Sequence, residues 1–220
     1  MTEHPLLVFD LDGTLFKTES VTIPAVTATF RRYGFTPPED RAIAAFFGRP
    51  WSEFHEWLRS RVGDDLAAAM GAEIDQLELA LVSEKGEWYP GAREAIRELR
   101  GWAEHMVICS NGTPEYVQCV LEAQAVGRLF DAVRWRLSRT ETKSLMVAEI
   151  LKRWDGRPAV VIGDREEDIR AAHDNELMGV GASYGYGVGS ELAEADALAG
   201  SAWELPRVLA RLLSAGRSDS

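Results

Sequence analysis

Two aspartates follow directly after a short apolar segment near the start of the chain: Leu6–Phe9 precedes Asp10 and Asp12. Residues two apart in an extended segment point to the same side, so these carboxylates should lie close together. They would resist joint ionisation unless a cation lies between them or one keeps a proton. A solvated acidic turn is the alternative, but the apolar segment favours the carboxyl edge of a buried sheet, where open α/β folds bind ligands. The pair predicts a cation-binding or proton-transferring site.

A second acidic pair follows another apolar segment, Ala159–Ile162, in which Asp164 comes soon after the segment and Asp168 four residues later. Both side chains can face one point if a helix begins here. Acidic residues also stabilise a helix N-terminus, which is the purely structural alternative. Oxygen donors without clustered histidine or cysteine favour Mg²⁺. We therefore predict a Mg²⁺ site whose members converge on one sheet edge: Asp10, Asp12, Asp164 and Asp168.

Smaller polar groups follow the apolar segment Met106–Cys109 and a predicted helix start. Ser110 and Asn111 would place a hydroxyl and backbone N–H groups where a strand passes into a helix, an arrangement that holds phosphoryl oxygens. Taken alone, these two residues and the following glycine are an ordinary turn, and a lone Lys143 is usually solvated. Beside the aspartates, Lys143 would supply the positive charge that an anionic ligand requires. We predict these three residues as substrate-binding groups.

The three apolar segments are typical of buried parallel strands, because each is short, continuous and followed by polar residues and glycine. Apolar residues at helical spacing lie between them, as in the stretch from Ala92 to Leu99. Strands that alternate with helices predict a doubly wound parallel α/β sheet, with the strand ends at one edge.

The stretch between Lys17 and Trp88 breaks this alternation, with helical patterns and no convincing strand. The first of its helices is expected to begin at Pro24, because proline favours the first helical turn. About 70 helical residues placed directly after the first strand predict an inserted all-α cap. The division is therefore a core of residues 1–16 and 88–220 and a cap of residues 17–87.

Composition limits the partners and the compartment. The chain has 220 residues, 35 acidic and 24 basic, for a net charge of −11. This balance argues against nucleic acid and anionic membranes, and by itself would argue against a phosphorylated substrate. Two cysteines are too few for a disulfide scaffold, and no signal segment or run of about 18 apolar residues is evident. We expect a cytoplasmic protein with a small-molecule substrate.

In this order, the motifs resemble those of the haloacid dehalogenase (HAD) superfamily, in the subgroup similar to phosphoglycolate phosphatases and phosphomutases. The matching segments, which span nearly the whole chain, are Asp10–Thr14, Ser110–Asn111, Lys143 and Gly163–Asp168. The resemblance implies a Rossmann-like core with a helical cap, Asp10 as nucleophile and Asp12 as general acid/base. Lys17 and Thr18 depart from it, because an Asp-Ser pair is common there, and this leaves the substrate open.

The resemblance implies a Mg²⁺-dependent phosphatase acting on a small phosphorylated metabolite, phosphoglycolate- or sugar-phosphate-like, through an aspartyl phosphate. The acid at Asp12 argues against carbon–halogen chemistry, which has no alkoxide to protonate. Two alternatives stay open. One is a phosphomutase of the β-phosphoglucomutase type, for which Arg49 could bind a substrate anion. The other is a non-catalytic, metal-binding regulatory module. The sequence does not indicate an oligomeric state.

Overall fold

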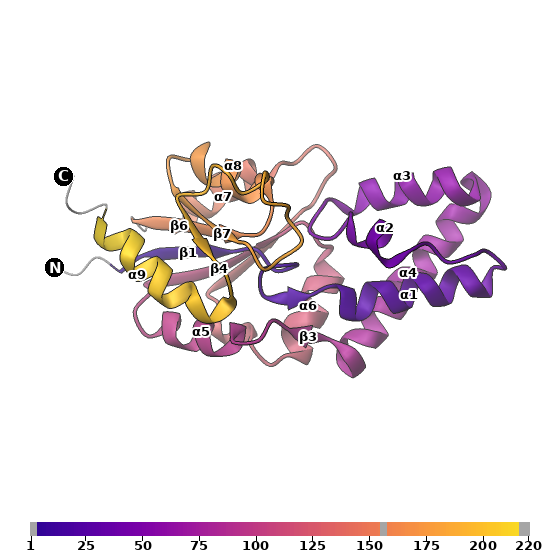
Figure 1. The fold of residues 1–220 in the computed structure, drawn as a ribbon, viewed down its shortest axis with the longest axis horizontal. Coiled ribbons are helices and arrows are strands. Elements are labelled where there is room, and N and C mark those ends of the chain that lie inside the picture. The colour runs from indigo at the N-terminus through magenta and orange to yellow at the C-terminus, as the bar shows by residue number, and fades with distance from the viewer. Residues whose placement is uncertain (1–3, 155–157, 216–220) are drawn as a thin grey trace.

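A computed structural model describes residues 4–154 and 158–215 of the chain (Figure 1). Within these residues, six parallel strands form the main sheet in the order β5-β4-β1-β6-β7-β8. The strands are β1 (Leu6–Phe9), β4 (His105–Ser110), β5 (Ala132–Trp135), β6 (Ala159–Gly163), β7 (Met178–Ala182) and β8 (Ala197–Ala199). Ranked along the chain, this order is 3-2-1-4-5-6, the Rossmann arrangement, in which the order reverses between β1 and β6.

The central strand β1 is buried on both faces of the sheet, as its apolar run predicts. Leu7 and Phe9 belong to one hydrophobic cluster, and Leu6 and Val8 to another, because successive side chains point to opposite faces. The first cluster is covered by α5 (Ala92–Arg100), α6 (Pro114–Ala123) and α9 (Leu205–Ala215). The second is covered by α7 (Lys143–Arg153) and α8 (Glu166–His173). The predicted doubly wound, Rossmann-like α/β fold is confirmed.

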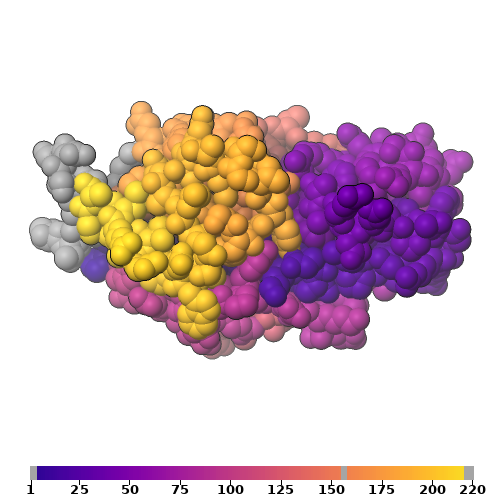
Figure 2. Space-filling model, in the orientation of Figure 1, coloured from indigo at the N-terminus to yellow at the C-terminus, as the bar shows by residue number. Residues whose placement is uncertain are grey.

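The remaining helices lie beside the carboxyl end of this sheet, and we call them the helical cap (Figure 1). They are α1 (Glu19–Arg32), α2 (Asp40–Ala44), α3 (Trp51–Val62) and α4 (Asp64–Lys85). A separate hydrophobic cluster holds them together, with Phe30, Phe54 and Met70 among its buried members. The space-filling view shows the indigo and purple cap against the orange and yellow part of the core (Figure 2). The cap therefore forms one wall of any site at this sheet edge.

The chain leaves the core and returns to it through a two-stranded antiparallel ribbon. Its strands are β2 (Phe16–Lys17) and β3 (Glu87–Trp88), so both ends of the helical stretch meet. Helix α1 begins at Glu19, five residues before the expected start, and Pro24 lies inside it. The helix predicted from Pro24 is therefore present, but its predicted first residue was wrong. Among the described residues, no helix combines the length and apolar character that a membrane crossing requires.

Candidate active site

Three of the predicted aspartates meet where the strand order reverses. Asp10 follows β1 and Asp164 follows β6, and the backbone N–H of Asp10 donates to the carbonyl of Ile162 at 2.8 Å. Asp168 comes from the first turn of α8, where its Oδ2 accepts a hydrogen bond from the backbone N–H of Arg165 at 2.9 Å. The fold therefore brings together groups that are more than 150 residues apart in sequence.

Lys143 is the cation of this acidic centre. It is the first residue of α7, whose N-terminus is capped by the Thr142 side chain accepting from the Leu145 N–H at 3.3 Å. Its Nζ lies 2.5 Å from Asp10 Oδ1 and 2.5 Å from Asp168 Oδ1. Burial alone would lower the pKa of Lys143, but the two carboxylates reverse this and raise it well above its usual value. The lysine therefore stays charged.

Two carboxyl groups of the centre, those of Asp10 and Asp164, resist ionisation. Burial raises the pKa of Asp10 well above its usual value, with Lys143 opposing the rise and Asp168 adding to it. Burial, and then repulsion from Asp168, raises the pKa of Asp164 to about 8. Three carboxyls facing one ammonium leave a surplus of negative charge when ionised, which is the electrostatic condition for holding a cation.

The same three aspartates fit a hard divalent metal ion. One carboxylate oxygen from each of Asp10, Asp164 and Asp168 lies within 4.8 Å of the others. Asp164 Oδ1 is buried and has no hydrogen-bond partner among the described residues, whereas its Oδ2 accepts from the Tyr186 N–H at 2.7 Å. Asp168 Oδ1 meets the Lys143 ammonium without hydrogen-bond geometry. A buried carboxylate oxygen without a partner, such as Asp164 Oδ1, is suited to act as a ligand of an oxygen-preferring ion such as Mg²⁺.

The fourth predicted aspartate, Asp12, is turned differently. Its Oδ1 accepts hydrogen bonds from the Thr18 hydroxyl and the Tyr116 hydroxyl, each at 2.7 Å, and its carboxylate is not part of the three-aspartate group. Burial raises the pKa of Asp12, and these two hydrogen bonds oppose the rise. A buried carboxyl with a raised pKa is suited to proton transfer. For the predicted metal contact, Asp12 has its backbone carbonyl to offer.

Ser110 and Asn111 follow β4 and take different positions. The Ser110 hydroxyl is fully buried, accepts from the Gly112 N–H at 3.0 Å, and helps to lower the pKa of Asp12. The Asn111 side chain donates at 2.9 Å to the Gly48 carbonyl of the cap and at 2.9 Å to Glu167 Oε2. The asparagine side chain therefore ties the core to the cap, and its backbone N–H is the group left for an anion.

Close packing around Asp164 and a contact to the cap complete the centre. The loop after β7 packs so closely on Asp164 that a Cβ at Gly187 would overlap its carbonyl. Gly13 (φ +86°), in the turn after β1, is equally close, because a Cβ there would overlap the Asp164 carboxylate. From the loop after β7 the Tyr186 hydroxyl bonds to the Glu19 carboxylate at the start of the cap. These residues position the metal-ligand candidate and the cap against each other.

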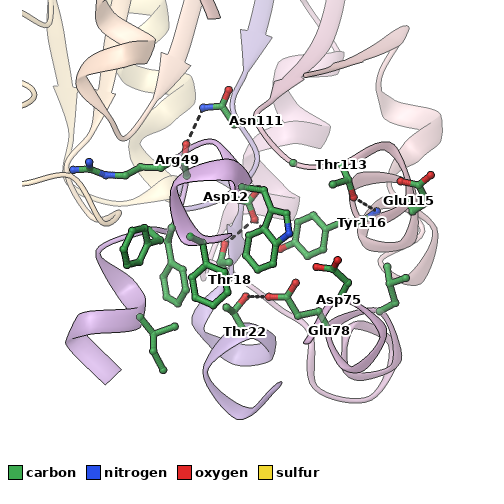
Figure 3. A pocket seen from close by; sticks show the side chains of 18 residues that line it. Asp12, Thr18, Thr22, Arg49, Asp75, Glu78, Asn111, Thr113, Glu115 and Tyr116 are labelled. Atoms are coloured by element: carbon green, nitrogen blue, oxygen red, sulfur yellow. Dashed lines mark hydrogen bonds between the residues drawn. The ribbon is translucent and has the colours of Figure 1, made fainter. Parts of the chain in front are cut away.

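A cavity of about 290 Å³ opens beside Asp12 between cap and core (Figure 3). Thr18 and Tyr116 lie at its inner end with Asp12, and neither was predicted as a site residue. Thr18 stands in the segment that departs from the family pattern, which was the one signal for it. Tyr116 had none, because only the fold brings helix α6 to the aspartate. A ligand in this cavity would therefore lie against the Asp12 carboxyl and its two hydrogen-bond partners.

The fold and site together define a Rossmann-like hydrolase with a carboxylate-rich centre beside a helical cap. Comparisons with known proteins agree with this class. The family model described as haloacid dehalogenase-like hydrolase matches residues 4–175. A phosphoglycolate phosphatase of Synechococcus elongatus is 23% identical over 191 residues, covering 82% of this chain and 84% of that protein. A haloacid dehalogenase-like family protein from Streptococcus pneumoniae has a TM-score of 0.81 at 21% identity, covering 94% of this chain and 99% of that one.

CbbY from Rhodobacter sphaeroides, in a structure that contains phosphate, has a TM-score of 0.76 at 23% identity, covering 92% of this chain and 96% of that one. The chain belongs to the haloacid dehalogenase-like hydrolase family, because the family model spans most of its length. The predicted family is confirmed, and so is the enzyme class, a HAD-like phosphoric monoester hydrolase, with relatives named as phosphatases.

Proposed function

We propose that this hydrolase is a Mg²⁺-dependent phosphatase of a small phosphorylated metabolite, which acts through an aspartyl phosphate on Asp10. The observation that carries the proposal is the placement of the Asp10 carboxylate, 2.5 Å from the Lys143 ammonium and within reach of two further aspartates. Residues 17–87 form the proposed cap over it. A cytoplasmic location belongs to the same proposal, supported by two free cysteines.

Asp10, Asp164 and Asp168 would hold the metal ion, with the backbone carbonyl of Asp12 as a further ligand. Their fit is supported by the grouped carboxylate oxygens and by the orphaned Asp164 Oδ1. When bound, Mg²⁺ neutralises negative charge on phosphoryl oxygens and favours attack by an anionic nucleophile. The negative surplus of the centre thus becomes compatible with an anionic substrate.

Asp10 is the proposed nucleophile. Its carboxylate oxygen forms a bond to phosphorus while the bond from phosphorus to the leaving-group oxygen breaks. Lys143 opposes the effect of burial on the pKa of Asp10, and would face the transferred phosphoryl oxygens. The Ser110 hydroxyl and the Asn111 backbone N–H complete the proposed phosphoryl cradle.

Asp12 is the proposed general acid and then the general base. In its protonated form it gives its proton to the departing alkoxide, and its carboxylate then takes a proton from the water that attacks phosphorus. The second step breaks the bond from Asp10 to phosphorus, and releases phosphate with Asp10 restored. Thr18 and Tyr116 hold Asp12 in place for both steps.

The test is phosphate release from p-nitrophenyl phosphate and a panel of phosphorylated metabolites, with Mg²⁺ and with EDTA. We expect activity that EDTA abolishes and that Asp10→Asn lowers to background, while the exposed Asp65→Asn on α4 retains it. Substantial Mg²⁺-dependent activity in Asp10→Asn would contradict the nucleophile role. Release from no substrate in the panel would favour the regulatory-module alternative.

The phosphomutase alternative is separated by product analysis. A mutase must hold a second anionic group under the cap, and Arg49 was the candidate for this. Its side chain pairs with Glu53 at 3.5 Å and points away from Asp12 (Figure 3). We expect inorganic phosphate as the product from sugar phosphates. Isomerised sugar phosphate in its place would support the mutase.

A further inference from the structure

The cavity beside Asp12 has aromatic walls. Phe46, Phe47, Trp51 and Phe54 come from the cap, and Tyr116 comes from the core (Figure 3). Trp51 and Phe54 stack with ring centroids 4.5 Å apart and an interplanar angle of 16°. Because a substrate bound at Asp10 must direct its alcohol part past Asp12, these rings would surround the leaving group.

Two carboxyls from helix α4 face the same cavity. Asp75 and Glu78 are three residues apart, on one face of the helix, and both line the cavity (Figure 3). Glu78 is only 7% exposed; its Oε1 accepts a hydrogen bond from the Thr22 hydroxyl, and no donor among the described residues reaches its Oε2. The Trp51 indole N–H lies near Asp75 and lowers its pKa, but it has no hydrogen-bond partner within hydrogen-bond geometry. Glu78 Oε2 is thus a polar atom at the far end of the cavity that a ligand could contact.

Positive charge is nearly lacking around this cavity. Among the residues that line it in the described part of the chain, Arg49 is the single cation, and its side chain points away to Glu53. Asp12 and Glu115 add two further acids to Asp75 and Glu78. A leaving group that carries a carboxylate or a second phosphate would therefore meet acidic side chains and no free counter-charge, whereas a cation would stabilise their ionised forms.

We propose that the cavity takes a leaving group ending in a positively charged amine, so that the substrates are phosphomonoesters of amino alcohols. The inference deepens the proposed phosphatase function and rests on it. A cationic head would lie against aromatic faces, which attract it through their quadrupoles. It would also favour the ionised forms of Asp75 and Glu78 behind these faces, against the burial that raises their pKa values. Phosphoglycolate, the substrate in the names of several relatives, carries an anionic leaving group and should be a poor substrate here.

The kinetic test compares three phosphomonoesters in the same Mg²⁺ assay: phosphocholine, its uncharged isostere 3,3-dimethylbutyl phosphate, and 2-phosphoglycolate. We expect kcat/KM for phosphocholine to exceed that of the isostere at least tenfold, with 2-phosphoglycolate lowest. In Asp75→Asn/Glu78→Gln, the ratio of amine to isostere should fall at least tenfold. The control Glu84→Gln, an exposed carboxylate on α4, should leave this ratio unchanged. If kcat/KM for the isostere or for 2-phosphoglycolate equals that for phosphocholine, the proposal is overturned.

A binding measurement separates this proposal from the phosphatase proposal. Choline and 3,3-dimethylbutanol are titrated into Asp10→Asn protein, and quenching of tryptophan fluorescence is followed, with Trp51→Phe as the second variant. We expect choline to bind more tightly, and both Trp51→Phe and Asp75→Asn to weaken this preference. Equal binding of the two alcohols would overturn the amine proposal even if hydrolysis is observed. Selective choline binding without hydrolysis of any ester would leave it standing and remove the phosphatase proposal.

Discussion

The Lys143 ammonium lies 2.5 Å from the Asp10 carboxylate, across 133 residues of sequence, and both groups are almost completely shielded from solvent. This pair joins the start of α7 to the end of β1. A buried charge whose partner is removed becomes strongly unfavourable, so each group depends on the other. The ion pair is therefore a structural contact, and in the proposed mechanism it also favours the ionised form of the nucleophile against the effect of burial.

The first prediction concerns Lys143→Met, which keeps a long unbranched side chain, one atom shorter, and removes its charge. We expect kcat/KM to fall by about 10²–10³, because a charge placed against the transferred group is lost. The variant should also lose more stability at pH 8 than at pH 5, since Asp10, whose pKa is raised by burial, can accept a proton at the lower pH. Phosphate release and urea unfolding at both pH values measure these effects.

The exposed lysine at the other end of the same helix, Lys152, provides the matched control, and Lys152→Met should behave as the unmodified protein. A loss of stability in Lys143→Met that is equal at both pH values would contradict the assigned charge balance. Activity within threefold of the original would contradict the role of the lysine in catalysis.

The second prediction concerns Asp12→Asn, in which the amide oxygen can still accept from Thr18 and Tyr116. With an alkyl phosphate, kcat should fall by about 10²–10⁴, the usual size of general acid–base catalysis. With p-nitrophenyl phosphate the loss in the first step should be much smaller, because this leaving group needs little protonation. Burst kinetics with both esters separate the two steps.

An equal loss of the first step for both esters would show that Asp12 does not protonate the leaving group. The positioning role of Tyr116 is checked with Tyr116→Phe, which removes one of the two hydrogen bonds to Asp12. Since that bond lowers the pKa of Asp12, its loss should shift the pH profile of the alkyl ester upward.

Strands of the fold could be predicted from sequence where the strand itself is a continuous apolar run. Continuous apolar runs identified β1, β4 and β6, because strands buried on both faces need no alternation. Strand β5, with all four residues half-buried, and strand β7, with two glycines, carry no such run. They were therefore not identified, although they belong to the same sheet.

Whereas Lys143 was predicted from a helix start beside the aspartates, most residues of the candidate site were predicted because they follow those recognisable strands. Asp10 and Asp164 were found in this way, and their meeting point follows from parallel strands ending at one edge. Asp75 and Glu78 could not be found, because acids on a long helix are ordinary until the fold turns one face toward a cavity. Only the tertiary contacts of α4 distinguish these two acids from other acids on the helix, and no local sequence pattern encodes those contacts.

The third prediction concerns metal binding, read from thermal unfolding. Mg²⁺ at about 100 times its dissociation constant should stabilise the protein by about 2.7 kcal/mol. For a chain of this size the midpoint should rise by roughly 5–10 °C. Asp164→Asn should gain little from Mg²⁺, yet without metal it should be at least as stable as the original, because a carboxyl whose pKa is raised to about 8 is removed.

Asp164→Asn is expected to lose the gain from Mg²⁺ but to keep its midpoint without metal. Damage to the fold would instead lower the unfolding midpoint both with and without Mg²⁺. Asp65→Asn, at an exposed position on α4, serves as the control and should show the full shift with Mg²⁺. A full shift in Asp164→Asn as well would remove Asp164 from the metal site.

The fourth prediction concerns Glu78→Gln and the pH dependence of stability. Burial raises the pKa of Glu78 from 4.5 to about 8, and both Asp75 and Asp12 add to the rise. The folded state therefore keeps a proton that the unfolded state releases, and stability must fall as pH rises from about 4.5 to 8. The cost from this residue has an upper bound of about 5 kcal/mol above pH 8.

The substituted glutamine cannot ionise and can still accept from Thr22, so Glu78→Gln should be close to the original in stability at pH 4.5 and clearly more stable at pH 8.5. Urea unfolding at several pH values gives the difference between the two proteins, in which the titration of groups remote from Glu78 cancels. The exposed Glu84→Gln should show no such trend. A constant difference for Glu78→Gln across this range would mean that Glu78 ionises in the folded protein at its ordinary pKa, and that the cavity is wetter than its aromatic walls imply.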